Sequence, residues 1–196
     1  MDFAVATNNK KKLAEINRIL NSLGHHGKSL NELGIHVDIV EDGETFAENA
    51  IIKARTVAQL CSLVTISDDS GLEVDYLNGA PGVYTARYAG ENATDDENID
   101  KLLRELRDVP KEDRTARFVS AVCMYDPSTG EDHVFIGKCE GYIGFERLGD
   151  DGFGYDPIFM VGDRSYAQMS PEEKDAISHR GIAMRLLEAH LSGRGE

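Results

Sequence analysis

The chain has 196 residues, of which 35 are Asp or Glu and 21 are Lys or Arg, so its formal net charge at pH 7 is −14. This excess of negative charge repels the phosphate backbones of DNA and RNA, so we expect no nucleic-acid partner. No stretch approaches the ~18 apolar residues of a membrane span, so we expect no membrane association. The three cysteines form no Cys-x-x-Cys pair and are odd in number, which predicts free thiols and a cytoplasmic protein.

Strands and helices alternate in the first half of the chain. Phe3–Ala6 has the pattern of a short buried strand, and apolar residues at helical spacing predict a helix from about Asn9 to Leu23. Residues 24–27 end this helix. The pair His25-His26 has no partner at metal-ligand spacing, and we interpret it as loop. Val37–Val40 is the next strand candidate.

Two Thr-x-x-Glu patterns predict helix starts, because the threonine hydroxyl and the glutamate carboxylate can each cap the other's backbone. The first is Thr45–Glu48, whose helix should reach about Cys61, and the run Leu63–Ile66 then predicts a strand. The second pattern is Thr94–Glu97. The core face of its helix should carry Ile99, Leu102, Leu103 and Leu106.

Strand pairs dominate the second half. Ala116–Tyr125 and His133–Ile143 flank the turn sequence DPSTGE and predict two long antiparallel neighbours. Ser170–Glu173 predicts a capped helix start with proline at its first position, and a further helical segment runs from Ser178 to about Leu191. No repeat or linker interrupts this order. We therefore expect one domain over residues 1–196, with an α/β fold built on a mixed sheet.

The adjacent carboxylates Asp68 and Asp69 raise the first functional question. They follow the predicted strand at 63–66 and precede Ser70 and Gly71, so an ordinary turn explains them as well as a ligand site does. If strand geometry persists, the two side chains point to opposite faces and do different jobs. The functional alternative is a carboxylate that binds Mg²⁺ or takes a proton from a metal-activated water.

Cations occupy helix starts, where the helix macrodipole disfavours them. Lys10–Lys12 fall in the first turn of the first predicted helix, after Thr7 and Asn9. Such a strand-to-helix junction suits a phosphate held by backbone N–H groups, and solvated lysines are the alternative. Lys174 and the pair His179-Arg180 repeat the pattern in the last helices, which favours a phosphate site without deciding it.

Two loops could contribute to the same site. Glu41 and Glu44 lie in the acidic sequence VEDGE, which either adds a carboxylate to the site or is simply solvated. In Gly152–Pro157 the glycines would let the backbone approach a ligand, while Phe153 offers a stacking face. A tight turn with Phe153 and Tyr155 in the core is the alternative.

These motifs together closely resemble a known family. The chain carries, in this order, TNNKKK at 7–12, SDDSGL at 67–72, GAPG with TARY at 79–88, FGYD at 153–156 and SHRG at 178–181. Together they resemble the inosine triphosphate pyrophosphatases, also called XTP/dITP diphosphatases or Ham1-like proteins. The resemblance implies a homodimer and an α/β fold, with a long twisted mixed sheet and helices that form two lobes around an active-site cleft. It also implies Mg²⁺-dependent hydrolysis of ITP, dITP and XTP to the monophosphate and pyrophosphate, by attack of a metal-activated water on the α-phosphorus.

The resemblance further implies residue roles. Asp69 would be the catalytic carboxylate and a metal ligand, assisted by Asp68 and by Glu41, with Glu44 as the alternative to Glu41. Asn8 stands where the family commonly has glycine. The implied substrate-binding residues are Thr7, Asn8, Asn9, Lys10, Lys11 and Lys12 for the triphosphate, Ser70 beside it, Phe153, Gly154, Tyr155 and Asp156 for base and sugar, Lys174 in the pocket, and His179 and Arg180 for the purine.

Two other functions compete with this interpretation. A Maf-type pyrophosphatase would act on other bases, and a non-catalytic nucleotide sensor would bind without turnover. SHRG and FGYD favour the inosine triphosphatases. In that case a donor from the His179-Arg180 segment would pair with the 6-oxo group of hypoxanthine and meet the amino donor of adenine. For the dimer surface, we expect the apolar strands after Ala116.

Overall fold

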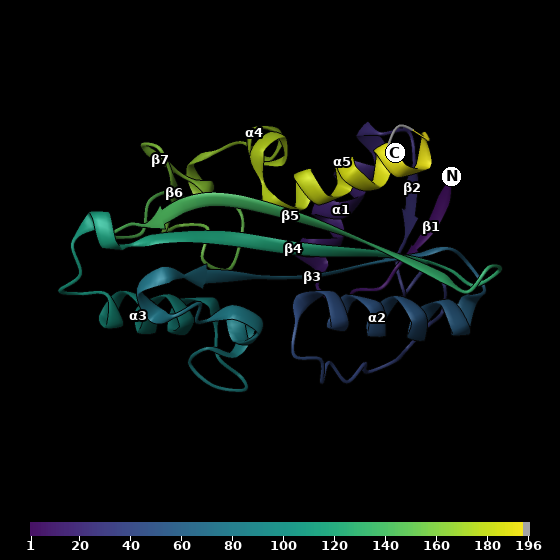
Figure 1. Cartoon of the computed structure of the whole chain (residues 1–196), viewed down its shortest axis with the longest axis horizontal. Coiled ribbons are helices and arrows are strands. Elements are labelled where there is room, and N and C mark those ends of the chain that lie inside the picture. Colours follow the sequence, from purple (N-terminus) through teal and green to yellow (C-terminus); the bar gives the residue numbers. More distant parts are fainter. Residues whose placement is uncertain (194–196) are drawn as a thin grey trace. The chain divides into compact units, whose positions relative to one another are not determined.

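The computed structural model describes residues 1–193 (Figure 1). The strands are β1 (Asp2–Val5), β2 (His26–Lys28), β3 (Thr65–Val74), β4 (Thr115–Asp126), β5 (Glu131–Ile143), β6 (Phe159–Val161) and β7 (Arg164–Ser165). They form one sheet in the order β2-β1-β3-β4-β5-β6-β7. β1 is parallel to β2 and β3, whereas β6 is antiparallel to β5 and β7, so the predicted α/β fold with a mixed sheet is confirmed.

Five α-helices accompany the sheet in the described part of the chain. They are α1 (Lys10–Ser22), α2 (Phe46–Cys61), α3 (Asp95–Glu105), α4 (Pro171–Ile177) and α5 (His179–Leu191). Short 3₁₀ helices lie at η1 (Asp75–Leu77), η2 (Gly82–Arg87), η3 (Lys111–Asp113) and η4 (Tyr166–Gln168). Within residues 1–193, none of these helices combines the length and apolarity that a membrane span needs.

The chain forms two compact units. Unit 1 comprises Met1–Asp69, Ser120–Gly137 and the chain from His179 onward, and unit 2 comprises Ser70–Val119 and Lys138–Ser178. β3, β4 and β5 each contribute residues to both units. One two-lobed domain over residues 1–196 stays a prediction.

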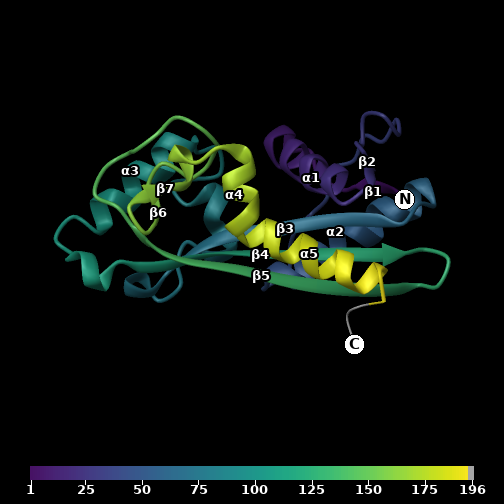
Figure 2. The ribbon, with the colours of Figure 1, turned by 90° about the horizontal axis from the view of Figure 1, so that it is seen from above.

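In unit 1, helices cover both faces of the strands. Phe3 and Val5 of β1 pack with apolar residues of α1 and α5, whereas Ala4 and Ala6 pack with Val57 of α2. This alternation is the period of two that a strand imposes on its side chains. Accordingly, Figures 1 and 2 show α1 and α5 on one face of the unit 1 strands and α2 on the other.

The second strand of the sheet lies elsewhere than predicted. Val37–Val40 forms no strand, and β2 beside β1 is instead His26–Lys28, so the loop interpretation of His26 was wrong. Gly27 fits closely there: a Cβ atom would lie 2.2 Å from Asn17 Oδ1 and 2.7 Å from Val5 Cγ2, so a larger residue would have to displace these side chains. The segment at 37–40 keeps its alternation of half-buried and exposed side chains. An alternating pattern shows only which side chains are buried. To form a strand, a segment also needs a neighbouring strand whose backbone N–H and C=O groups are still free to pair with it.

The turn interpretation of the paired carboxylates was wrong as well. β3 does not end at Ile66 but continues through the Asp-Asp-Ser-Gly sequence to Val74. Residues 65–69 of this strand are all buried, and β3 lies between β1 and β4. Asp68 and Asp69 therefore belong to a central strand of the sheet. Polar residues in a central strand are costly unless they are paired, and the partners described below explain why this strand tolerates them.

Unit 2 has its own core, in which α3 packs on strand residues. Ile99, Leu102 and Leu106 are buried as predicted, and the Thr94–Glu97 capping box has both of its hydrogen bonds. The Ser170–Glu173 box is also complete and opens α4. At α2, the Thr45 hydroxyl caps the helix, but the Glu48 carboxylate accepts from the Glu44 N–H instead of the Thr45 N–H.

β4 and β5 are neighbours in the sheet, as predicted, and the Gly130 N–H closes the turn between them on the Asp126 carbonyl oxygen at 2.8 Å. The apolar residues of β4 do not form a surface patch. Ala116 and Phe118 are buried in the core of unit 2, and Val122 and Met124 in that of unit 1. These side chains of β4 therefore pack within the chain, whereas Ile136 of β5 is exposed. The expected dimer surface on the strands after Ala116 stays a prediction.

Candidate active site

Asp68 of β3 is a fully buried anion. Its Oδ2 accepts hydrogen bonds from Lys12 Nζ and from a terminal guanidinium nitrogen of Arg180, each at 3.0 Å, and the hydroxyl of Ser120 donates to Oδ1. Burial opposes the ionisation of Asp68, but Arg180 and Lys12 outweigh it and hold the pKa of this carboxyl well below its ordinary value. Asp68 is thus a fixed negative charge at neutral pH.

Arg180 links this anion to α1. Its other terminal nitrogen donates to Glu15 Oε1 at 2.5 Å, and both side chains are buried. Burial lowers the pKa of Arg180, but Asp68 and Glu15 raise it further than burial lowers it. A row of alternating charges therefore runs from Glu15 on α1 through Arg180 on α5 to Asp68 on β3, all buried, and ends at the half-buried Lys12 of α1. This row holds two helices to the strand.

Asp69 belongs to a second group of charges, built on α2. Lys53 Nζ donates to Asp69 Oδ1 at 3.4 Å, to Glu41 Oε1 at 2.8 Å and to the carbonyl oxygen of Asp68 at 2.7 Å. These three acceptors match the three N–H donors of an ammonium group. Lys53 thereby brings the predicted carboxylates Glu41 and Asp69 to a single point, while the Glu44 backbone is tied to Glu48.

The environment of Asp69 suits a proton acceptor. Burial raises the pKa of Asp69, and the neighbouring Lys53 and Lys12 offset only part of that effect. Burial lowers the pKa of Lys53, but the carboxylates of Asp69 and Glu41 raise it by more, so the net effect is a raised pKa. The Asp69 side chain keeps 12% of its surface exposed. A reachable carboxylate with a raised pKa is well matched to general base catalysis.

The first loop is organised around the start of α1. The Thr7 hydroxyl accepts from the Asn9 N–H at 3.1 Å, and Asn9 Oδ1 caps the helix by accepting from the N–H groups of Lys11 and Lys12 at 3.0 and 3.1 Å. Among the described residues only Ser62 and Asn78 are non-glycine positions with positive φ. Asn8 therefore sits in this loop without a left-handed backbone.

The remaining predicted residues around unit 1 have diverse surroundings. Lys10 and Lys11 are exposed on the first turn of α1, and Ser70, which follows Asp69 on β3 and begins unit 2, is half-buried. His179 begins α5 and is buried. A Cβ atom on Gly137 of β5 would lie 1.9 Å from the His179 carbonyl oxygen, so glycine is needed where this helix meets the strand.

Within unit 2, three predicted residues come together. Lys174 Nζ bonds Asp156 Oδ2 at 2.7 Å and lies 5.0 Å from the centroid of the Phe153 ring. The same carboxylate accepts from the Phe153 N–H at 3.1 Å. Gly152 has φ +75°, and a Cβ there would come within 2.1 Å of Asp156 Oδ2. The loop therefore presents a half-buried aromatic ring beside a buried cation.

The other two residues of this motif support the loop. Tyr155 is buried in the core, and its hydroxyl donates to the Thr85 carbonyl oxygen at 2.8 Å, so the core interpretation was right for this residue. Gly154 has φ +60°, and its N–H donates to Asp95 at 2.9 Å. Both contacts are structural, and they anchor the loop directly after Phe153.

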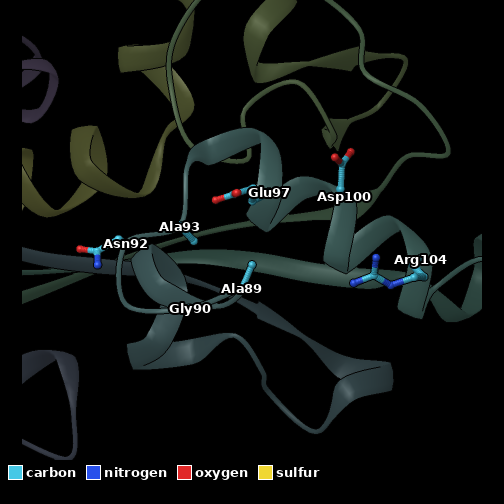
Figure 3. Close-up of a pocket in the computed structure, with 7 residues that line it drawn as sticks. All are labelled: Ala89, Gly90, Asn92, Ala93, Glu97, Asp100 and Arg104. Carbon is cyan, nitrogen blue, oxygen red and sulfur yellow. The ribbon is translucent and has the colours of Figure 1, made fainter.

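Unit 2 also contains an open hollow of about 480 Å³ between α3 and the segment before it (Figure 3). None of the predicted site residues lines it. The Glu97 carboxylate there caps the Thr94 N–H, and Asp100 accepts from Arg147. These two acidic groups therefore serve the structure of α3. The lining residues are Ala89, Gly90, Asn92, Ala93, Glu97, Asp100 and Arg104.

Sequence reasoning missed three residues of the site. Lys53 and Glu15 each lie among apolar residues on the buried face of a helix, and a charged residue on such a face was the available signal. Ser120 lies within a predicted core strand and carries no comparable signal.

In the described part of the chain, no group of three or more His, Cys, Asp or Glu side chains is arranged to hold a metal.

A sequence profile of the Ham1 family matches residues 3–190. The chain belongs to the Ham1 family. A dITP/XTP pyrophosphatase of Bacillus licheniformis is 48% identical to it over 189 residues, which are 95% of this chain and 96% of that protein. The protein of that name from Bacillus subtilis is 48% identical over 185 residues, 93% of each chain.

Solved Ham1 structures have the same fold. The Staphylococcus aureus Ham1 protein aligns with a TM-score of 0.86 at 44% identity, over 98% of this chain and 99% of that one. A HAM1 protein from Coxiella burnetii aligns with a TM-score of 0.87 at 42% identity and the same coverage. This Ham1 chain therefore shares its architecture with its relatives along nearly its whole length.

Proposed function

We propose that this Ham1-family protein hydrolyses the non-standard purine nucleoside triphosphates ITP, dITP and XTP to the monophosphate and pyrophosphate. Support comes from the names of its relatives and from the charges around β3. The observation that carries the proposal is the pair Asp68 and Asp69. One is locked as an anion by Lys12 and Arg180, and the other has a raised pKa beside Lys53. A nucleotide-binding protein without turnover needs no such division between neighbouring carboxylates.

Asp69 is the proposed general base. It accepts a proton from the water that attacks the α-phosphorus, and its raised pKa improves this transfer near neutral pH. Lys12, held at 3.0 Å by Asp68, and the exposed Lys10 and Lys11 stabilise the negative charge that develops on the departing pyrophosphate. Asp68 acts in this scheme by positioning Lys12.

The residues present fit a Mg²⁺ ion. Mg²⁺ in nucleotide enzymes is typically bound by one or two carboxylates together with substrate phosphates, and it keeps several waters. Glu41 and Asp69 converge on one ammonium and are the proposed ligands, with Glu44 less well placed. The ion would neutralise phosphate charge and lower the pKa of a bound water. Lys53 provides a positive charge at the same carboxylates.

The substrate-binding roles follow the groups in each unit. Thr7, Asn8 and Asn9 form the proposed phosphate loop at the start of α1, with Ser70 near the carboxylates. Phe153, Gly154, Tyr155 and Asp156 form the proposed base and sugar loop, with Lys174 beside the ring. The proposed donor that selects the 6-oxo purines comes from His179 or from the backbone of the His179-Arg180 segment, because both terminal nitrogens of Arg180 bond Glu15 and Asp68. We also propose that the protein is a cytoplasmic homodimer.

Pyrophosphate release from ITP, XTP, dITP, ATP and GTP, each with and without Mg²⁺, tests this function. We expect fast, Mg²⁺-dependent release from the first three and little from ATP and GTP. Turnover of other bases would indicate a Maf-type activity. Binding of dITP without release of pyrophosphate would make the protein a sensor and would overturn the proposal.

Asp69→Asn should lower kcat by roughly 10²–10⁴-fold, the usual contribution of a general base. Its stability should be retained, because burial already disfavours the charged form of Asp69 and the fold does not depend on that charge. Steady-state kinetics with dITP and thermal unfolding of the same preparation measure both quantities. Wild-type turnover in this variant would remove Asp69 from the mechanism.

A further inference from the structure

Asn49 of α2 holds the loop that carries Glu41. This asparagine is buried, and its Oδ1 accepts from the Gly43 N–H at 2.8 Å while its Nδ2 lies 3.4 Å from the Gly43 carbonyl oxygen. A single side-chain amide thus engages both backbone polar groups of one loop residue. Its own N–H donates to the Thr45 carbonyl oxygen at 3.2 Å, so the amide projects from a fixed point at the start of the helix.

Gly43 fits this contact because it has no side chain. A Cβ atom at this position would lie 2.7 Å from Asn49 Oδ1 and 2.8 Å from Glu48 Cβ. Cβ atoms essentially never come this close to their neighbours, so an alanine would push the loop away from the helix. The close approach of the loop backbone to α2 therefore depends on both residues.

Three residues of α2 hold the loop in succession. Glu48 accepts from the Glu44 N–H at 2.7 Å, Asn49 engages Gly43, and Lys53 reaches Glu41 at 2.8 Å. Glu48 and Asn49 bind only backbone, so they set the path of the loop. That path decides where the Glu41 carboxylate lies relative to Asp69.

We propose that Asn49 is a positioning residue for the metal site: through Gly43 it holds Glu41 at the point where Glu41 and Asp69 can share one cation. The inference deepens the proposed function, since it concerns the proposed Mg²⁺ ligands. Groups that orient metal ligands typically contribute about 10- to 100-fold to metal affinity. Asn49 itself touches neither the substrate nor the reacting atoms.

Unit 2 offers a matched control for this role. Asn98 of α3 is equally buried, accepts from the Ala89 N–H at 2.8 Å and donates to the Ala86 carbonyl oxygen at 3.1 Å. It performs the same kind of loop attachment with no proposed metal ligand in the loop. Asn98→Ala should therefore cost a similar amount of stability and leave metal affinity unchanged.

The test measures Mn²⁺ binding to the full-length protein by electron paramagnetic resonance, with thermal unfolding as a check of folding. Asn49→Ala and Gly43→Ala should each weaken Mn²⁺ binding by about tenfold or more. The Asn49→Ala/Gly43→Ala double variant should bind about as well as either single variant, because the two changes break one contact. Gly43→Ala leaves α2 intact, so it tests the loop attachment even if Asn49→Ala unfolds the protein.

Glu41→Gln determines whether the effect passes through Glu41. In that background, adding Asn49→Ala should cause no further loss of Mn²⁺ affinity. Three results would each overturn the inference. The first is a Mn²⁺ affinity within about twofold of wild type in folded Asn49→Ala and Gly43→Ala. The others are an equal loss of affinity in Asn98→Ala, and an undiminished effect of Asn49→Ala in the Glu41→Gln background. Failure of the proposed function appears separately, as wild-type protein that releases no pyrophosphate from dITP.

Discussion

The starts of α2 and α3 share one sequence pattern, Thr-x-x-Glu-Asn, and build nearly the same structure. In each, the threonine caps the helix and the asparagine attaches the preceding loop to it. The next residue on that helix face, four positions after the asparagine, differs. It is Lys53 in α2 and Leu102 in α3.

The residue at this position separates the candidate active site of unit 1 from the apolar core of unit 2. Lys53 is buried among three oxygen acceptors from Asp68, Asp69 and Glu41. Leu102 is fully buried among apolar side chains of unit 2. The same local frame thus serves chemistry in one unit and packing in the other, and the surrounding strands decide which residue fits.

Leu102→Lys should have the largest effect of the changes that test this comparison. An ammonium at this position would enter an apolar core, and uncompensated buried charges cost about 3–5 kcal/mol. Urea unfolding should show a loss of that size or no folded protein. A variant as stable as wild type would mean that unit 2 can supply acceptors as unit 1 does.

Lys53→Met keeps a long side chain but removes the cation between Glu41 and Asp69. We expect kcat/KM for dITP to fall by about 10²–10³-fold, the usual loss when one preorganised donor is removed. Leu102→Met is the matched control and should keep its turnover, with a stability loss below about 1.5 kcal/mol. Equal kinetic effects of the two changes would contradict the division between site and core.

The two helix caps should contribute alike to stability. Thr45→Ala and Thr94→Ala each remove a side-chain cap, which costs about 1 kcal/mol in the free energy of unfolding. Only Thr45→Ala should also weaken Mn²⁺ binding, because fraying of α2 loosens the attachment of Gly43 to Asn49. Denaturant unfolding and Mn²⁺ titration of both variants check this. Weaker binding in Thr94→Ala as well would indicate a general loss of folding.

Exposed ion pairs of unit 2 should act on stability alone. Hydrogen bonds from Arg117 and Thr115 hold the pKa of Asp75 below its ordinary value of 3.8. Ionised Asp75 therefore stabilises the fold above pH 3.8, and this contribution is lost as the pH falls through the lowered value. Because the pair is solvent-exposed, Asp75→Asn should cost at most about 1 kcal/mol at pH 7, with unchanged turnover. Urea unfolding should show the difference from wild type shrinking below pH 3.8.

Local patterns predicted well wherever a segment carries its own signal. The capped helices, the long strand pair and the ordered motifs of the family all depend on neighbouring residues, and each was recognisable before any tertiary contact was known. Val37–Val40 shows the limit. Its side chains alternate as a strand's do, yet the backbone position beside β1 belongs to His26–Lys28. Which segment occupies an edge depends on packing between distant parts of the chain.

By itself the sequence determined the α/β class, the family and the two carboxylates on which the proposed chemistry rests. Only the tertiary structure decided how those carboxylates differ. β3 continues through them, so Asp68 faces α1 and α5 while Asp69 faces α2. Their partners come from other elements, Arg180 from 112 positions away and Lys53 from 16. Charge and burial act through space, and a pKa is therefore set by neighbours that the linear order of residues does not reveal.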